Sequence, residues 1–274
     1  MFNIKGHSGC ELVIFVEDGQ SFVKKISAST DYTPRLHAQA AKQKYFCDKL
    51  LGASGIVVPT VIRTGNDSFS MNFFHGKDPV TFFMSSPNFN IDGFFEKLSN
   101  FIAYEVSECE EQLFDKDGFL KKFYSVRKKV GESVVNFHAI EKIFNDLPVI
   151  KIPVGMCHGD LTFSNIIVGT DQKLCLIDFL DTFYESPLQD MVKIRQDTLY
   201  NWTPMVYNKN YDKARYAIVM NYLDKKFDSF FKEYEFYNAY YNAFQIMNYI
   251  RILPYAKKNK IKKNVIFNVE EMIT

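Results

Sequence analysis

Hydrophobic residues fall into short runs over the first sixty positions, a pattern that favours strands. Residues 11–16 and 21–26 are β-rich and flank Asp18-Gly19, a dipeptide typical of hairpin turns. Across residues 34–51 apolar and small residues recur at helical intervals, and Gly52 and Gly55 follow where the helix should end. Another strand is expected near Val57. The pattern therefore predicts strands around one helix.

The remainder of the chain changes from strand to helix periodicity. Residues 69–74 form an apolar strand candidate that ends at the turn-rich group 75–79, where we place a boundary between two lobes. Helical spacing follows over residues 94–108, 119–137, 188–200 and 213–253. Between these helices, residues 165–169 and 173–177 predict two short strands. The expected fold class is α+β, with a mixed α/β lobe over residues 1–76 and a mainly helical lobe over 77–274.

Composition supports a folded chain and limits its partners. Of the 274 residues, 47% are hydrophobic, which is enough apolar surface to build a large core and argues against disorder. The 27 Phe and 16 Tyr are interpreted mostly as core residues. No segment approaches the roughly 20 apolar residues of a membrane helix, and five scattered cysteines without a C-x-x-C pair indicate reduced thiols. We therefore expect a cytoplasmic protein with no membrane partner.

Charge gives no reason to expect a nucleic-acid partner. The 33 Lys and Arg residues nearly cancel 32 Asp and Glu residues, so that the formal net charge is +1. The one concentrated basic run, residues 257–263, is interpreted as a solvated segment near the end of a helix. Binding of an anionic partner by these lysines is the alternative.

The most informative segment is His158-Gly159-Asp160-Leu161-Thr162-Phe163-Ser164-Asn165, followed by Asp178 within Leu176-Ile177-Asp178-Phe179. It supplies two carboxylates and an amide oxygen, which suit phosphoryl transfer, a reaction governed by positioning and metal-assisted charge neutralisation. Both kinds of oxygen also suit Mg²⁺. The predicted hairpin after Asn165 would fold Asp178 back toward it, so a shared metal site is expected.

This segment resembles the catalytic loop and metal-binding turn of the protein-kinase-like fold. Its H-x-D-L-x-x-x-N skeleton matches the kinase pattern, although Gly159 stands where protein kinases usually carry Arg. The combination of H-G-D, Asn165 and I-D-F is similar to aminoglycoside and choline phosphotransferases. Leu180 replaces the Gly of D-F-G, and no A-P-E-like segment follows. The resemblance implies a two-lobed kinase-like fold and favours a small-molecule kinase over a protein kinase.

The resemblance also implies roles for these residues. Asp160 would be the catalytic base or hydroxyl-orienting group, Asn165 and Asp178 would bind Mg²⁺, and His158 would be structural. The reaction would transfer the γ-phosphate of ATP to a hydroxyl group of a small metabolite. Sugar, amino alcohol and aminoglycoside acceptors stay open, with a metabolite preferred over an antibiotic.

The amino-terminal part would supply the nucleotide clamp. Gly6, His7, Ser8 and Gly9 precede a strand, where small residues let backbone amides approach phosphate oxygens, although an ordinary turn would look the same. Lys24 and Lys25 both end the strand that resembles the site of the phosphate-binding lysine. Strand alternation turns only one of them inward, and we favour Lys25, with Lys24 as the alternative.

The clamp has two further candidate parts. A kinase lysine usually pairs with a Glu on the next helix, but here the best-placed residues are Gln39 and Gln43. Gln43 is expected to hydrogen-bond the lysine, unless it is an exposed helix residue. Residues 71–76 resemble the inter-lobe hinge of these kinases, whose backbone contacts adenine.

Five residues beyond the D-F-L turn are further candidates. Asp190 resembles a helix-start carboxylate that braces the catalytic loop, and Asp181 is either a turn cap or a metal or substrate ligand. Asp197, Tyr200 and Trp202 would suit a cationic or sugar acceptor, but packing in the core or on the surface is the favoured interpretation. Two alternative functions follow: a protein kinase, and a catalytically silent nucleotide-binding scaffold suggested by the Gln positions.

Overall fold

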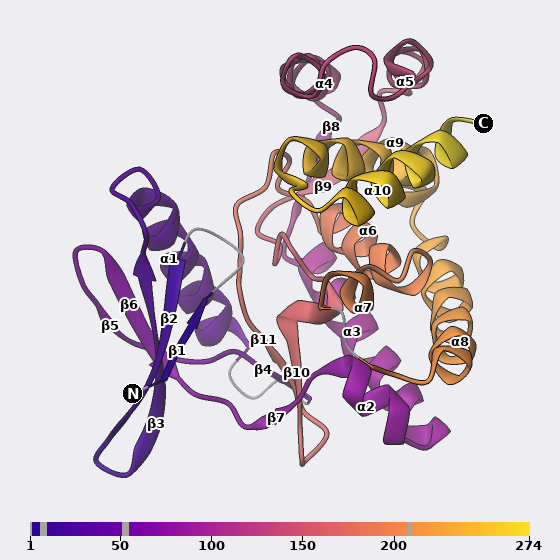
Figure 1. Ribbon diagram of the computed structural model, residues 1–274. Helices are drawn as coiled ribbons and strands as arrows, with labels where there is room; N and C mark the ends of the chain where they lie inside the picture. Colours follow the sequence, from indigo (N-terminus) through magenta and orange to yellow (C-terminus); the bar gives the residue numbers. More distant parts are fainter. Residues whose placement is uncertain (1, 6–9, 51–54, 208–209) are drawn as a thin grey trace. The chain divides into compact units, whose positions relative to one another are not determined.

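The computed structural model describes residues 2–5, 10–50, 55–207 and 210–274 (Figure 1). The expected phosphate loop, residues 6–9, lies outside the described residues. The chain divides into two compact units, each discontinuous in sequence. Unit 1 contains Met1–Phe101 and His158–Asp181, and unit 2 contains Ile102–Cys157 and Thr182–Thr274. The lobe boundary expected at residue 76 stays a prediction.

A five-stranded antiparallel sheet forms the first layer of unit 1. The strands are β1 (Phe2–Lys5), β2 (Cys10–Glu17), β3 (Gln20–Ser27), β6 (Ser68–Asn72) and β5 (Val61–Thr64), in that order. Asp18 and Gly19 link β2 to β3 with φ values of 51° and 77°, the left-handed backbone that a tight hairpin requires. The hairpin predicted from Asp-Gly is confirmed.

One helix covers a face of this sheet. Helix α1 (Thr33–Lys49) has Pro34 in its first turn, where the missing N–H costs nothing. Its Leu36 and Ala40 lie in one cluster with Phe69 and Met71 of β6. Leu36 and Ala40 are four positions apart and therefore share a helix face, whereas Phe69 and Met71 are two apart and share a sheet face.

A second, four-stranded sheet belongs to unit 1. Its order is β4 (Ile56–Val57), β11 (Leu174–Leu176), β10 (Ile166–Gly169) and β7 (Gly76–Lys77). The predicted hairpin β10–β11 is present, and the strand expected near Val57 joins it in parallel. A Cβ at Gly76 would lie 2.5 Å from the Val168 carbonyl oxygen, so glycine permits this close pairing of β7 with β10.

Aromatic packing within the same unit supports residues 158–165, the segment with the H-x-D-L-x-x-x-N pattern. Helices α2 (Pro79–Ser85) and α3 (Asn88–Ser107) contribute Phe83 and Phe94, whose ring centroids lie 5.7 and 5.2 Å from that of Phe163. Phe163 begins the short 3₁₀ helix η1 (Phe163–Asn165) and is completely buried. Residues 158–165 are therefore held in the hydrophobic core by Phe163, which lies between the polar residues Asp160 and Asn165.

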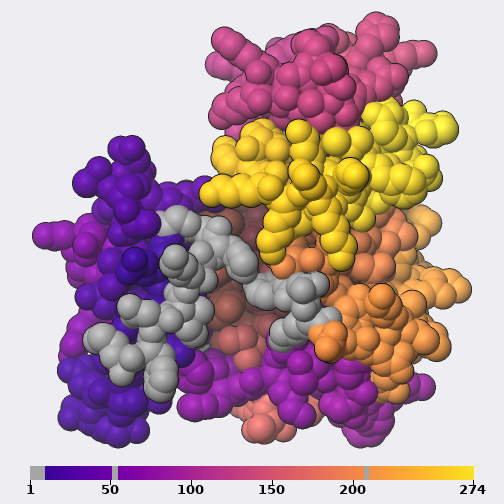
Figure 2. All heavy atoms as spheres, viewed as in Figure 1, coloured from indigo at the N-terminus to yellow at the C-terminus, as the bar shows by residue number. Residues whose placement is uncertain are grey.

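Unit 2 is predominantly helical. It contains a two-stranded sheet, β8 (Glu110–Leu113) with β9 (Lys151–Val154), and these helices: α4 (Lys116–Val130), α5 (Phe137–Asn145), α6 (Pro187–Thr198), α7 (Trp202–Tyr207), α8 (Lys213–Phe231), α9 (Glu235–Ile252), η2 (Leu253–Tyr255) and α10 (Asn259–Ile273). Figure 2 shows the yellow C-terminal segment against the magenta α4–α5 segment, where Asn136 N donates to Glu270 at 3.1 Å.

The helix predicted over residues 119–137 was wrong in extent. Helix α4 ends at Val130 because Gly131 has φ +90°, a left-handed conformation that stops a helix, and α5 begins only at Phe137. Residues 213–253 likewise form two helices rather than one continuous element. None of the five cysteines, all of which lie within the described residues, forms a disulfide bond. Among the described helices, none combines the length and apolar composition that crossing a bilayer requires.

Candidate functional site

Residues 158–165 begin with a tight loop at His158-Gly159-Asp160. Gly159 has φ +87°, in the left-handed region that residues with a Cβ rarely adopt. The loop is closed by Asp160 N, which donates to Nδ1 of His158 at 3.3 Å, and by Thr162 N, which donates to the Asp160 carbonyl oxygen at 2.7 Å. The backbone around Asp160 is thus fixed by local bonds.

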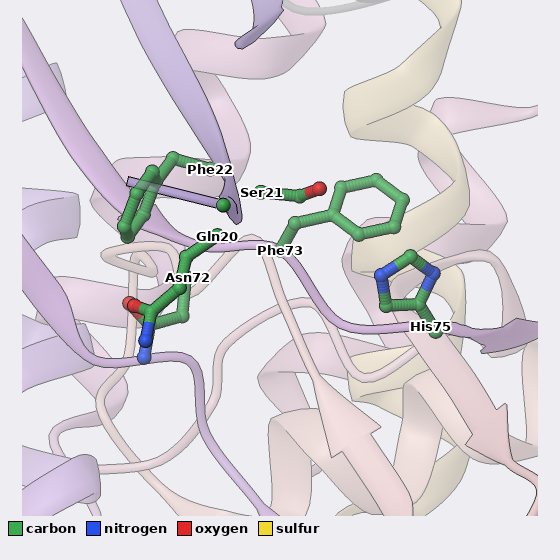
Figure 3. A pocket seen from close by; sticks show the side chains of 7 residues that line it. Gln20, Ser21, Phe22, Asn72, Phe73 and His75 are labelled. Carbon is green, nitrogen blue, oxygen red and sulfur yellow. The ribbon is translucent and has the colours of Figure 1, made fainter. Parts of the chain in front are cut away.

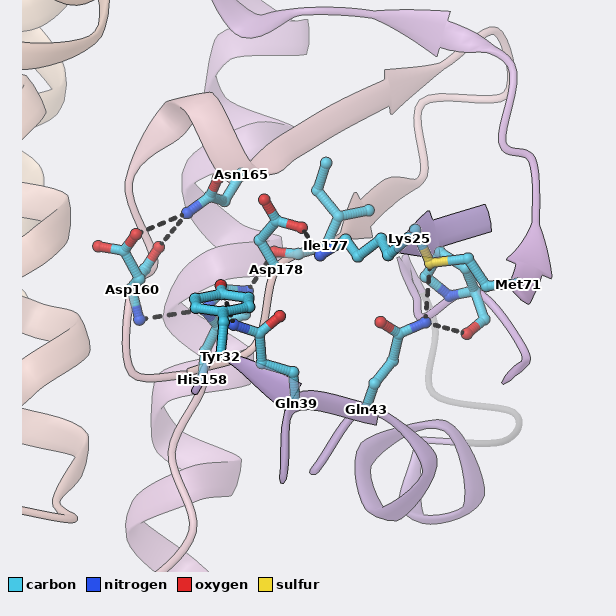
Figure 4. A network of polar contacts seen from close by, with 11 residues as sticks. Lys25, Tyr32, Gln39, Gln43, Met71, His158, Asp160, Asn165, Ile177 and Asp178 are labelled. Carbon is cyan, nitrogen blue, oxygen red and sulfur yellow. Dashed lines mark hydrogen bonds and ion pairs between the residues drawn. The ribbon is translucent and has the colours of Figure 1, made fainter. Parts of the chain in front are cut away.

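Asn165 holds the Asp160 carboxylate in place. Its Nδ2 donates to the Asp160 carbonyl oxygen at 2.7 Å and to Oδ2 at 3.0 Å (Figure 4). Because both partners are acceptors, the amide nitrogen must be the atom that faces them, and the amide oxygen is directed elsewhere. Asn165 can therefore orient Asp160 and still present an oxygen to a cation.

The D-F-L turn brings Asp178 back to this loop. Ile177 N donates to the Asn165 carbonyl oxygen at 3.0 Å, and Leu180 N donates to the His158 carbonyl oxygen at 2.9 Å. Asp178 itself has φ +64°, an uncommon conformation for a residue with a side chain. Such strain concentrates at functional sites because the surroundings must hold it.

His158 connects the Asp160 loop to the D-F-L turn. Its Nε2 bonds to the Ile177 carbonyl oxygen at 2.9 Å, and its ring packs on Phe179 with centroids 4.3 Å apart. Burial lowers the pKa of His158 to about 4, although the nearby Asp160 carboxylate opposes the shift. The neutral ring, protonated on Nε2 and accepting on Nδ1, satisfies both contacts. These contacts give His158 the structural environment that the sequence predicts.

Lys25 reaches Asp178 from strand β3. Its ammonium forms an ion pair with Asp178 Oδ1 across 153 positions of sequence (Figure 4). Lys25 pairs with Phe69 in the sheet and so lies on the face covered by α1, whereas Lys24 lies on the other face. The Lys25 side chain is 4% exposed and that of Asp178 is 35% exposed, so the carboxylate stays accessible to a ligand.

The hydrogen bonds of the two candidate glutamines within the described residues go to groups other than Lys25. Gln43 is buried, and its Nε2 donates to the Pro59 carbonyl oxygen at 2.6 Å and to Sδ of Met71 at 3.2 Å. Gln39 donates to the Tyr32 hydroxyl at 3.1 Å. Among the described residues, no hydrogen bond joins Gln43 to Lys25, so the contact expected from the sequence is absent. The partner of Lys25 is Asp178 instead.

Asn165 and Asp178 fit a magnesium ion that is completed by phosphate oxygens. Mg²⁺ is commonly held by one or two protein oxygen ligands together with substrate phosphates and water, and this pair offers an amide and a carboxylate. Over the part of the chain that the structure describes, no group of three His, Cys, Asp or Glu side chains is arranged to hold a metal.

Sequence reasoning missed Lys42 and Phe46 on α1. Lys42 is 2% exposed and donates from Nζ to the Leu180 carbonyl oxygen at 2.7 Å. Phe46 stacks on Phe179, with ring centroids 5.0 Å apart. The two residues are four positions apart, so they share a helix face, and this spacing was the available signal. Their contacts join the helix to the D-F-L turn.

The remaining candidate residues lie in unit 2, apart from Asp181. Asp190 is buried in the first turn of α6, and its bracing role stays a prediction. Asp197 is also buried and accepts a bond from Thr203 N at 2.6 Å. Tyr200 and Trp202 are partly exposed and contact the ring of Tyr249. Asp181 is exposed at the end of unit 1.

A shallow pocket of about 390 Å³ lies at the start of β3 and the end of β6 (Figure 3). It is lined in part by Phe22 and Asn72, which are paired across the sheet. Their neighbours Val23 and Met71 face α1, so strand alternation directs Phe22 and Asn72 to the opposite face from Lys25. The pocket therefore contains none of the catalytic side chains.

A family model and solved structures both match the chain. The model of the phosphotransferase enzyme family matches residues 114–221, a range that includes Asp160, Asn165 and Asp178. No curated protein sequence matches. The predicted resemblance to aminoglycoside and choline phosphotransferases is confirmed.

The structural matches extend over nearly the whole chain. A thermostable mutant of aminoglycoside phosphotransferase APH(4)-Ia in its apo form has a TM-score of 0.64 and 10% identity, covering 99% of this chain and 93% of its own. The ternary complex of streptomycin and ATP with APH(2")-IIa has a TM-score of 0.56 and 15% identity, covering 99% and 92%. Choline kinase LicA from Streptococcus pneumoniae has a TM-score of 0.57 and 11% identity, covering 98% and 91%. The chain has the kinase-like fold predicted from the sequence.

Proposed function

We propose that this protein is an ATP-dependent phosphotransferase that transfers the γ-phosphate to a hydroxyl group of a small metabolite. The observation that carries the proposal is the arrangement of Lys25, Asp160, Asn165 and Asp178. An ion pair joins Lys25 to Asp178, and hydrogen bonds join Asn165 to both Asp160 and the D-F-L turn. The matched family and the neighbouring kinases support this reaction class.

Lys25 and Asp178 are the nucleotide-binding pair in this proposal. Lys25 supplies a positive charge for phosphate oxygens, while the accessible Asp178 carboxylate and the Asn165 amide oxygen would hold Mg²⁺. The ion neutralises charge on the transferring phosphoryl group when it is bound. Residues 6–9 are proposed to contact phosphate through backbone amides, and the segment after β6 to contact the base.

Asp160 is the residue proposed to act on the acceptor. Its carboxylate would accept a hydrogen bond from the acceptor hydroxyl and hold the oxygen in line with the γ-phosphorus. The bond from the γ-phosphorus to the bridging oxygen of ADP breaks, and a bond to the acceptor oxygen forms. The hydroxyl proton passes to Asp160. Asn165 keeps the carboxylate oriented through its bond to Oδ2.

The acceptor proposal draws its support from the names of the structural neighbours. Streptomycin, hygromycin B and gentamicin occupy aminoglycoside phosphotransferases, and another neighbour is a choline kinase. We propose an acceptor of the sugar or amino alcohol type. A mass-shift screen with ATP and Mg²⁺ across sugars, amino alcohols and aminoglycosides identifies it.

Two substitutions test the assigned roles. Asp160→Asn is expected to lower turnover by roughly 10²- to 10⁴-fold and to change ATP affinity little, because the carboxylate acts on the acceptor. Asp178→Ala is expected to lower turnover and also Mg²⁺-dependent ATP affinity. Steady-state kinetics and calorimetry with ATP, each with and without Mg²⁺, separate the two.

The control is Asp171→Asn, which removes an exposed carboxylate from the turn between β10 and β11. It is expected to behave like the wild type. Equal and negligible effects of Asp160→Asn and Asp178→Ala would contradict the proposal. ATP binding without phosphorylation of any acceptor in the screen would favour the silent scaffold.

A further inference from the structure

Lys42 is a buried charge whose position in α1 calls for an explanation. Its ammonium is removed from water, a costly arrangement unless polar groups compensate, and it donates to the Leu180 carbonyl oxygen at 2.7 Å. Leu180 lies two positions after Asp178 and 138 positions from Lys42. The bond of this buried ammonium group is therefore a specific connection between α1 and the D-F-L turn.

Phe46 fixes the rotation of the helix at this connection. Its ring stacks on Phe179 with an interplanar angle of 25°, and Phe179 packs in turn on His158. Since residues four apart lie on the same helix face, the contact of Phe46 also directs Lys42 toward the turn. Two consecutive turns of α1 therefore contact Phe179 and Leu180, the residues that follow Asp178.

Within the described part of the chain, neither candidate glutamine makes the ordinary kinase connection between helix and lysine. Gln39 bonds to Tyr32, and Gln43 bonds to Pro59 and Met71, so neither joins α1 to Lys25. Lys25 pairs with Asp178 directly. The helix reaches the Asp178 turn through Lys42 and Phe46 instead.

The turn needs such support because of its backbone. Asp178 adopts φ +64°, which persists only where neighbouring contacts enforce it. Two backbone bonds hold the turn, from Ile177 N to Asn165 and from Leu180 N to His158. Lys42 adds a bond to the Leu180 carbonyl group from a different element. All three contacts flank the strained residue.

The structure assigns to Lys42 the role of a positioning residue: by holding the Leu180 carbonyl group, it keeps the Asp178 carboxylate in the orientation that binds magnesium-loaded nucleotide. In this chain α1 is thereby connected to the turn that follows Asp178, and Lys25 pairs with Asp178 itself. The nucleotide-binding part of this inference rests on the proposed function, but the effect on the turn does not.

The test compares variants on one helix. Lys42→Met keeps the aliphatic chain and removes the donor, Lys42→Arg keeps a donor, and Lys44→Met removes an exposed lysine from the same helix. Lys42→Met is expected to weaken ATP binding in Mg²⁺ by on the order of tenfold, and ATP binding in EDTA by less than threefold. Lys42→Arg is expected to recover at least part of the loss, and Lys44→Met to match the wild type.

Hydrogen exchange gives a readout that is independent of nucleotide. The Ile177 and Leu180 amides are expected to exchange faster in Lys42→Met, while the β2–β3 hairpin amides keep their wild-type rates. If Lys42→Met is globally destabilised, the amides of both the turn and the β2–β3 hairpin will exchange faster. The same comparison is then made in Lys42→Arg and Lys42→Gln. Wild-type exchange at the turn together with unchanged Mg²⁺ dependence would overturn the inference. If the protein proves not to transfer phosphate, the exchange measurement still decides whether Lys42 positions the turn.

Discussion

Gly159 shows how one residue in the motif is set by its backbone. Protein kinases usually carry Arg at this position, and the sequence alone treats the difference as a sign of enzyme class. In the structure Gly159 has φ +87°, between His158 and Asp160, which are bonded to each other. A conformation that only glycine adopts easily is reason enough for the residue found here.

Gly159→Ala is expected to destabilise the protein by about 1–2 kcal/mol, because a Cβ is disfavoured at positive φ. Turnover should fall as well, since the same loop orients Asp160. Urea denaturation and steady-state kinetics measure the two effects.

Gly131→Ala is the matched control for this change. Gly131 has φ +90°, no atom lies within 4 Å of its added Cβ, and it follows α4 in unit 2. It should lose similar stability and keep full turnover. If Gly131→Ala lost as much turnover as Gly159→Ala, the role assigned to the loop around Asp160 would be contradicted.

Residue-level prediction succeeded where the information was local. The H-x-D-L-x-x-x-N spacing places Asn165 within one loop of Asp160, and strand alternation correctly separates Lys25 from Lys24. The Gln43 contact was wrong because it depends on how α1 is rotated about its axis. The packing of Phe46 on Phe179 sets that rotation. Because these two residues lie far apart in the sequence, the local pattern around α1 does not reveal the rotation.

At the scale of elements, His158 couples the catalytic loop to the D-F-L turn in a pH-dependent way. Its pKa is lowered from 6.5 to about 4 by burial, so the unfolded chain binds a proton between these values while the folded protein does not. The contribution of His158 to the free energy of unfolding is therefore fully present above about pH 6.5. It falls as the pH decreases toward 4, by at most about 3 kcal/mol. Urea denaturation at a series of pH values measures this slope.

The slope is assigned to His158 by substitution. His158→Gln should be less stable at neutral pH, because the ring contacts are lost, and should show a smaller decrease between pH 6.5 and 4. His138→Gln removes an exposed histidine and should retain the wild-type slope. An identical slope in His158→Gln would show that other groups cause the acid sensitivity.

Elements with their own periodicity or turn signal were predictable, and those made by tertiary pairing were not. The hairpins β2–β3 and β10–β11 follow from alternation and turn residues. Strands β4 and β7 have two residues each and exist because β11 and β10 pair with them. Two residues carry no periodic signal, so their strand pairing becomes visible only in the fold.

At the scale of the molecule, nucleotide binding should stabilise the protein and depend on magnesium. ATP at 100 times its Kd with Mg²⁺ is expected to add about 2.7 kcal/mol of stability, because it binds the folded state alone. This corresponds to an increase in Tm of roughly 5–10 °C. EDTA should remove most of the increase, which thermal denaturation measures.

EDTA without ATP is the control and should leave Tm unchanged. Asp178→Ala should lose the magnesium-dependent part of the ATP effect. Equal stabilisation by ATP in Mg²⁺ and in EDTA would contradict the assignment of Asn165 and Asp178 as metal ligands. The predicted cytoplasmic location stays a prediction, which cell fractionation tests.

The discontinuity of unit 1 has a consequence for synthesis on the ribosome. Residues 158–181 complete a unit that begins at the amino terminus, and the first segment of unit 2 is translated between the two parts. Strands β10 and β11, and with them the partner that Lys25 uses, are absent until that late segment emerges. While residues 102–157 are translated, the nascent chain therefore contains the first part of unit 1 without its last segment, and Lys25 has no counter-ion until Asp178 emerges.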